Sequence, residues 1–528
     1  MEEKMTQDVF VSAGAGGRQT ALPGWVLVAA LALFACTPGT ALAQRPCPLD
    51  YATKDTVAMA LEPPAATRVP DDVCLPRPAP DIPLAHFDDH SWRTFIALVW
   101  PVLRGERGVA DPDQVLETVS EPDATPPGPS LVFETYKADW ETFPFNGTKP
   151  YEWNDPRAEW SAAQWQCQAL GAQSGDFFLA PSTADYRPAS PEDFGYFDNV
   201  VEFAGKPGSV LVAQNGTLVR YLAAYNQIEF NQILVKKWYL ADRLPNKPDQ
   251  KIEFLNGSLS VKSAWVDMAK LDQMGNIVGG YTVARPETFH RLKAWLYDPY
   301  ARTCERHVVG LVGLHIVHKT PLRPQWIWST FEHVDNAPDR AAPLPLDPST
   351  STGSSCPTPS NKMDYYTFND GSHSPMQTLP ADYLTDQILS AHCPPRPVNV
   401  ERVHPINRSH DDKVVRNTQE TNAIWQAGLR KKRSVWQYYQ LVMTQWPTDR
   451  GTIPGPDALE HSAFSNATLE TWAQTDVTSG CMSCHGIAQQ RDHIDFVWSL
   501  RMNAYPRGTS RSSPAVKELQ DLSSKSAR

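Results

Sequence analysis

Apolar and polar residues alternate between about residues 198 and 340, and this period of about two predicts β-strands. Val210–Ala213 and Thr217–Ala223 flank the dipeptide Asn215-Gly216, a pattern that predicts a hairpin. Asn226–Tyr239 has helical spacing instead and is expected to lie between strands as a helix. Further strands are predicted at Ser258–Met268, Glu305–His318 and Pro324–Val334.

Helical spacing of apolar residues recurs on both sides of this region. The segment His90–Val99 follows Asp88 or Asp89, either of which can cap a helix, and stops before Pro101. From about residue 400 the pattern turns helical, in Lys413–Gln426, Ser434–Gln445 and Asn466–Thr475. The chain is therefore predicted to be α+β, with a mixed, sheet-containing main region and a helical C-terminal segment.

The composition favours a folded protein that does not bind nucleic acid. The 528 residues are 41% hydrophobic and 20% charged, with a net charge of −11 and no long basic block to attract phosphate backbones. The one basic run, Arg430–Arg433, is expected to be a solvated turn between helices. The alternative for this run is a docking patch for an acidic redox partner or for phospholipid headgroups.

The N-terminal segment resembles a secretory signal. An apolar stretch from Ala21 to Ala35 is too short for a comfortable membrane span, and Ala41-Leu42-Ala43 has the small-residue pattern of a signal-peptidase site. We therefore expect residues 1–43 to be removed and the mature chain to begin at Gln44, in the periplasm or outside the cell, without a transmembrane helix. The alternatives are a lipid anchor at Cys36 and an uncleaved membrane anchor.

Proline outnumbers glycine, 47 to 29, and its clusters suggest how the chain is divided. Residues 44–85 are expected to form an extended arm held by a disulfide, and residues 337–362 a linker or long surface loop. The expected organisation is a signal peptide over 1–43, a main region over 44–400, a helical segment over 401–506 and a polar tail over 507–528.

Cysteine usage agrees with export. Without the presequence eight cysteines remain, and six of them lie outside the motif described below. In an oxidising compartment these six can form three disulfides in 15 possible pairings, and local loops favour Cys47 with Cys74 and Cys356 with Cys393. The alternative is six partly buried thiols. The six are Cys47, Cys74, Cys167, Cys304, Cys356 and Cys393.

The strongest chemical signal is the sequence Cys481-Met482-Ser483-Cys484-His485, which has the C-x-x-C-H pattern of covalent haem c attachment. Each thiol adds to one haem vinyl group, and His485 is then placed as the proximal iron ligand. A redox dithiol needs a preceding strand, where a helix is predicted, and in a zinc site the adjacent ligands 484 and 485 cannot easily reach one tetrahedral ion.

This motif resembles that of bacterial c-type cytochromes, and the resemblance rests on Cys481, Cys484 and His485 alone. It implies electron transfer through one covalently held haem c per chain. In small cytochromes c the motif lies near the start of the domain and a distal Met follows, whereas only 43 residues follow His485 here. The haem is therefore expected to pack against the rest of the protein.

The sixth iron ligand is left open by the sequence. Met502 is the nearest plausible thioether, and it would raise the reduction potential if it binds the iron. Met443, on a predicted helix, and His493 are the other candidates, beside an open or water-occupied position.

Two predicted strands supply further candidates for the surroundings of a haem. On a regular strand His315 and His318 lie on opposite faces and cannot bind one metal ion, although either can face a haem. Trp326 and Trp328 share one face and pack either near the haem or in the core. The segments 310–320 and 323–333 also resemble those of a family of exported bacterial proteins with a terminal haem motif, which implies no activity.

Three functions fit these observations. The first is an exported monohaem c-type cytochrome that exchanges single electrons with a redox partner protein or a small-molecule donor or acceptor. The second is a haem-dependent oxidoreductase, such as a peroxidase or oxygenase, with an open iron site. The third is a haem-based sensor or binding protein. Dihaem enzymes are disfavoured because the chain has no second C-x-x-C-H motif.

Overall fold

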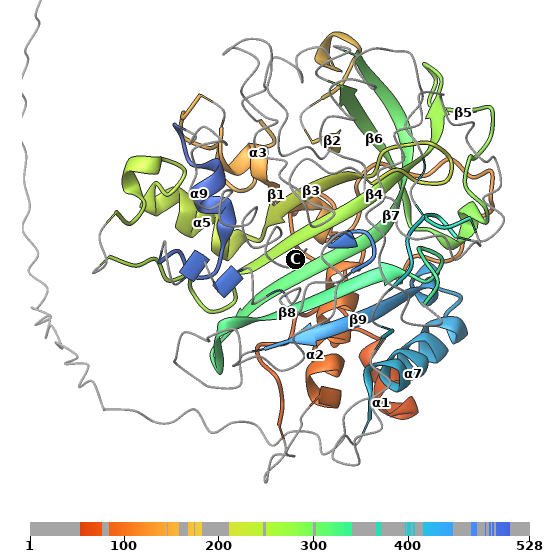
Figure 1. Cartoon of the computed structure of the whole chain (residues 1–528), viewed down its shortest axis with the longest axis horizontal. Helices are drawn as coiled ribbons and strands as arrows, with labels where there is room; N and C mark the ends of the chain where they lie inside the picture. The colour runs from red at the N-terminus through yellow and green to blue at the C-terminus, as the bar shows by residue number, and fades with distance from the viewer. Residues whose placement is uncertain are drawn as a thin grey trace, which may run out of the picture. The chain divides into compact units, whose positions relative to one another are not determined.

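A mixed sheet that curls back on itself organises the described part of the chain (Figure 1). Its order is β5-β4-β3-β2-β6-β7-β8-β9, with β1 paired to β3 and a further pairing of β4 with β7 that closes the curl. All pairs are antiparallel except β2 with β6. The strands are β1 Lys137–Ala138, β2 Phe178–Pro181, β3 Arg220–Tyr225, β4 Leu259–Leu271, β5 Ile277–Val278, β6 Arg291–Asp298, β7 Thr303–Thr320, β8 Arg323–His333 and β9 Tyr439–Gln445.

The computed structural model describes part of the 528 residues, and all of its described elements belong to the single compact unit Cys47–Arg528. Within these residues no helix is long and apolar enough to cross a membrane. The described residues are 53–75, 84–144, 146–157, 167–173, 175–181, 211–246, 250–298, 303–339, 366–370, 397, 399–402, 405–406, 416–446, 466–471, 481, 485–486, 488–489 and 493–506.

The α+β class predicted from the sequence is confirmed, and the alternating segments became the long central strands β4, β7 and β8. The predicted hairpin also forms: Val212 bridges Leu218, and Gly216 in the turn has a φ of 80°, which glycine adopts without strain. The helix expected at Asn226–Tyr239 is α5, Gln227–Lys236, capped by the side chain of Asn226.

Three helices lie together by β9: α1 (Lys54–Ala60), α2 (Leu84–Leu98) and α7 (Thr418–Lys431) (Figure 1). The α2 hydroxyl of Ser91 is 2.7 Å from both Ser329 Oγ on β8 and Thr444 Oγ1 on β9, which marks the face that α2 covers.

Two expectations for these helices were wrong. Asp88 and Asp89 do not cap α2 but are buried within it, where Asp88 accepts a hydrogen bond from Thr444. The arm expected over 44–85 contains the helix α1, whose N-terminus is closed by a Thr53–Thr56 capping box. The high proline content of this segment therefore led to the wrong expectation that all of it is extended.

The helix predicted at Ser434–Gln445 was also wrong. Val435–Tyr438 is a single 3₁₀ turn, and the chain then continues as the edge strand β9. Its residues pair with β8, with Thr330 opposite Met443 and Trp328 opposite Gln445. The apolar pattern here fits both periods, and pairing with the exposed edge of β8 decided between them.

The described residues of 466–506, called the C-terminal segment from here on, pack on the sheet face opposite α2. Tyr221 on β3 donates its hydroxyl proton to the Thr468 carbonyl, and Asn466 donates to Thr330 Oγ1 on β8. The described part of the helix expected at Asn466–Thr475 is a series of turns instead. The short helix α9, Trp498–Asn503, follows, and Tyr505 after it bridges Leu240, which comes shortly after the end of α5.

A disulfide between Cys167 and Cys304 joins residues 137 positions apart, with a Cα–Cα distance of 5.2 Å. It ties the segment before β2 to the start of β7. Cys74 is disulfide-bonded as well. The expected pairings of Cys47 with Cys74 and of Cys356 with Cys393 involve residues outside the described part, so they stay predictions. Most of the linker expected at 337–362 also lies outside the described residues.

Candidate functional site

One face of the sheet carries a row of polar side chains toward the C-terminal segment. Lys262 on β4 is opposite His315 on β7, which is opposite Thr330 on β8. His315 Nε2 lies 2.7 Å from Glu470 Oε1, so the row is connected to the turn that precedes the haem motif. Desolvation raises the pKa of the partly exposed Glu470 carboxyl, but the interactions with His315 and Lys262 and the hydrogen bond from the Asn466 N–H outweigh it, so this pKa is lowered.

The predicted separation of the two β7 histidines is confirmed. His315 faces Glu470, whereas His318 is buried on the other face with its ring centroid 5.6 Å from that of His90 on α2. The shared face of Trp326 and Trp328 is confirmed too, since both indoles contact the C-terminal segment.

His485 lies against this face with one ring nitrogen already engaged. Its Nδ1–H donates to the carbonyl oxygen of Phe496 at 2.7 Å, which leaves Nε2 as the nitrogen with a free lone pair. The indole of Trp328 packs beside the imidazole, with 4.3 Å between ring centroids and 47° between planes.

Burial lowers the pKa of His485 to about 4, against the opposing effect of the hydrogen bond to Phe496, and the nearby ammonium group of Lys262 lowers it further. The imidazole is therefore neutral at pH 7. A neutral imidazole with Nδ1–H bound to a carbonyl is the state in which histidine binds a metal through Nε2.

The other predicted site residues are placed as follows. Cys481 and Met502 are partly buried against the main hydrophobic core, with Met502 on α9. Met443 is buried on β9 beside Thr330, not on a helix. Cys484 lies outside the described residues, and the identity of the sixth ligand stays a prediction.

Sequence reasoning missed the residues that hold His485. The loop His493–Phe496 supplies the carbonyl that binds Nδ1, and it contacts Lys319 and Trp326 on the sheet. The sequence had singled out Trp326 and His493 as candidates near a haem, but no local pattern marks Lys319, Asp495 or Phe496, because these residues meet only through the folding of β7 and β8 against the C-terminal segment.

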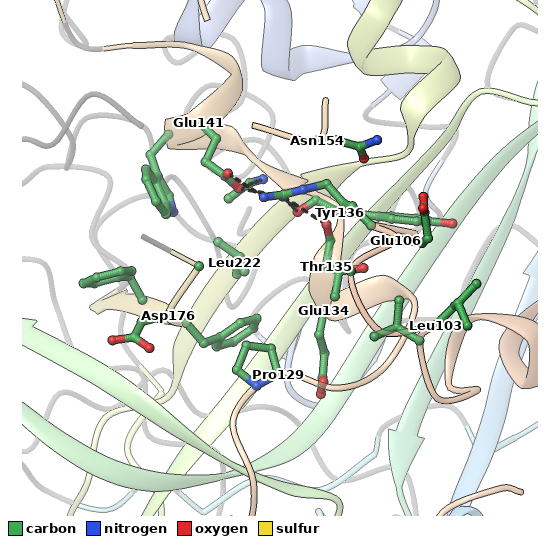
Figure 2. A pocket seen from close by; sticks show the side chains of 18 residues that line it. Leu103, Glu106, Pro129, Glu134, Thr135, Tyr136, Glu141, Asn154, Asp176 and Leu222 are labelled. Atoms are coloured by element: carbon green, nitrogen blue, oxygen red, sulfur yellow. Dashed lines mark hydrogen bonds and ion pairs between the residues drawn. The ribbon is translucent and has the colours of Figure 1, made fainter. Parts of the chain in front are cut away.

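A separate cavity of about 250 Å³ lies near β1 and β3 (Figure 2). Its lining includes Glu134 and the ion pair of Arg107 with Glu141, but no described residue of the 481–506 segment. Glu134 also contacts the buried His290, whose Nε2 lies 2.5 Å from Glu134 Oε1. Four charged side chains of the lining, those of Arg107, Glu134, Glu141 and Asp176, already have partners within the protein, so we base no proposal on this cavity.

Comparisons with known proteins identify no relative: no family model, no curated protein and no solved structure matches the chain. Among the residues that the structure describes, no group of three or more His, Cys, Asp or Glu side chains is arranged to hold a metal ion.

Gly313 allows the turn before the haem motif to approach the sheet. A Cβ atom at this position would overlap Thr468 Oγ1 and come within 3.1 Å of Leu469 Cδ1. We expect Gly313→Ala to lower the free energy of unfolding by about 1–3 kcal/mol, as overpacking does elsewhere.

Urea unfolding measures this effect, with Gly128→Ala as the neutral control because nothing lies within 4 Å of its Cβ position. Equal stability of the Gly313→Ala variant and the wild type would show that the turn does not need this close approach.

Proposed function

We propose that this chain is an exported monohaem c-type cytochrome that binds haem covalently and transfers single electrons. The observation that carries the proposal is the state of His485: the residue that the C-x-x-C-H motif designates as proximal ligand has Nδ1–H bound to a carbonyl, a neutral ring and Nε2 available. This hydrogen bond was not part of the motif, so it supports the proposal independently.

The donor set fits haem c. Cys481 and Cys484 would form the two thioethers, and His485 Nε2 would bind the iron. The bound group would supply a reversible one-electron change at iron. The protein's own part is to orient the imidazole through Phe496, to shield one side of the ring with Trp328 and to set the local charge through Lys262, His315 and Glu470.

Export is part of the same proposal. The Cys167–Cys304 disulfide is typical of proteins that fold in an oxidising compartment, where haem c is also attached. We propose that the mature chain resides in the periplasm or outside the cell and exchanges electrons with a redox protein or a small molecule there. The haem-dependent oxidoreductase and the haem-based sensor remain the competing functions.

The test is expression with c-type haem maturation proteins, followed by mass spectrometry and absorption spectra. We expect one covalent haem per wild-type chain and none in Cys481→Ala/Cys484→Ala. Cys74→Ala is the control, since it removes a disulfide-bonded cysteine outside the motif. A low-spin spectrum without a response to carbon monoxide supports electron transfer, whereas a high-spin spectrum with carbon monoxide binding favours an enzyme or a sensor. Wild-type protein without covalent haem would refute the proposal.

A further inference from the structure

The loop that binds His485 has an unusual backbone. His493, Asp495 and Phe496 have φ angles of 55°, 53° and 67°, all in the left-handed region although none is glycine. Such conformations cost energy, least for Asp and His and more for a bulky residue such as Phe, and they persist only where the surroundings fix them. Three within four residues indicate that this loop is held in place by strong contacts.

Those contacts come from the ends of two central strands. Lys319 Nζ on β7 lies 2.5 Å from Asp495 Oδ2, and Trp326 Nε1 on β8 donates to the Asp495 carbonyl at 3.1 Å. The Asp495 carboxylate also accepts from the Phe254 N–H at 2.7 Å, and the Asp495 N–H donates to Gln489 Oε1 at 2.7 Å. Asp495 is thus fixed from four directions, directly before the residue whose carbonyl binds His485.

The ion pair is deeply buried, because the Lys319 and Asp495 side chains are only 2% and 6% exposed. Lys319 also lies over the indole of Trp326, 5.6 Å from its centroid. Desolvation offsets much of the attraction in a buried pair, so such pairs contribute little net stability relative to an apolar replacement. A role in fixing one backbone geometry accounts better for a charged pair at this position.

We propose that Lys319 and Asp495, with Trp326, are positioning residues that hold the loop His493–Phe496 so that the Phe496 carbonyl fixes the tautomer and orientation of the His485 ring. The proposal rests on the proposed function for its purpose, because a fixed ring with Nε2 free is what a proximal ligand needs. The geometry itself belongs to the chain without haem and can be tested there.

The test is nuclear magnetic resonance of the full chain, purified without haem and carrying ¹⁵N-labelled histidine, with His485 assigned by His485→Gln. In the wild type we expect the Nδ1–H tautomer of His485. In Lys319→Met the hydrogen bond to Phe496 is expected to weaken, which shifts the tautomer ratio toward Nε2–H by about fivefold. Lys319→Arg retains the cation and is expected to restore the wild-type ratio.

Lys137→Met is the matched control, because Lys137 is a fully buried lysine paired with Glu141 on a distant part of the sheet. A wild-type tautomer in folded Lys319→Met, or an equal shift in Lys137→Met, would overturn the proposal. If Lys319→Met does not fold, Asp495→Asn tests the proposal by the same tautomer measurement. This variant removes the charge that pairs with Lys319, but its amide oxygen can still accept the hydrogen bond from the Phe254 N–H.

The haem-loaded protein gives a second measurement. A weaker bond at Nδ1 makes the imidazole a poorer donor, so the reduction potential of Lys319→Met/Asp495→Asn, which removes both charges of the pair, is expected to rise above that of the wild type and of Lys137→Met. An unchanged potential would contradict the positioning role. Failure of the wild type to attach haem would refute the proposed function, whereas the tautomer measurement would still decide this inference.

Discussion

Replacing His290 by leucine is expected to lower the free energy of unfolding by about 3–5 kcal/mol, because it leaves a buried carboxylate without its counter-charge. The His290 ring bridges Glu117 at Nδ1 and Glu134 at Nε2, and the Glu134 side chain is fully buried. Glu134 also accepts hydrogen bonds from the backbone N–H groups of Ser130 and Leu131, so it cannot turn toward water.

Urea unfolding at pH 7 measures this effect. His290→Leu/Glu134→Gln is expected to recover part of the loss, because the amide removes the stranded charge and its oxygen can still accept from the backbone. Lys149→Met breaks an exposed ion pair with Glu152 and is expected to change stability by about 0.5 kcal/mol or less. A His290→Leu loss as small as that of Lys149→Met would contradict the importance of the buried pair.

The same imidazole predicts a pH dependence. Burial alone would lower the pKa of His290, but Glu117 and Glu134 outweigh burial and raise the pKa to about 10, from an ordinary value of 6.5. A raised folded-state pKa gives stability that is fully present below about pH 6.5 and is lost as the pH rises toward 10. The stability difference between wild type and His290→Leu should therefore shrink over this range, and a constant difference would contradict the assignment.

Removing the Cys167–Cys304 disulfide by Cys167→Ala/Cys304→Ala is expected to cost about 2–5 kcal/mol of folding stability. The bond closes a loop of 137 residues, and a long loop restricts the unfolded chain more than a short one. Both cysteines are also buried in the main core, so replacing their side chains by alanine leaves small cavities there.

Urea unfolding with and without reductant measures the contribution of this bond. Reductant is expected to destabilise the wild type more than the double variant, which retains the disulfide of Cys74. Equal sensitivity of the two proteins to reductant would show that the Cys167–Cys304 bond does not form in the purified protein.

The central strands were predictable because their signal is local. The period-two pattern placed β4, β7 and β8 within a few residues of their observed bounds, and it put His315 and His318 on opposite faces. The same alternation placed Trp326 and Trp328 together. The alternation arises because one face of each strand is buried in the core and the other is not. It can therefore be recognised in the sequence of a single strand, without knowing which strands pair with it.

The edge strand β9 could not be predicted in the same way. Its sequence fits helical and extended spacing alike. The strand forms because one of its edges pairs with β8, which lies more than 100 residues earlier in the chain. The Cys167–Cys304 bond, by contrast, is the pair that remains when local loops join Cys47 to Cys74 and Cys356 to Cys393, but only the fold shows that the segment before β2 lies beside the start of β7.

The sequence by itself determined the α+β class, the long alternating strands and the C-x-x-C-H motif as the candidate haem site, since each of these depends on neighbouring residues. Only the tertiary structure decided what surrounds His485. The Phe496 carbonyl and the Trp328 indole reach the imidazole from separate segments of the chain, and the Lys319–Asp495 pair holds the loop that supplies the carbonyl; close packing of these segments brings them together.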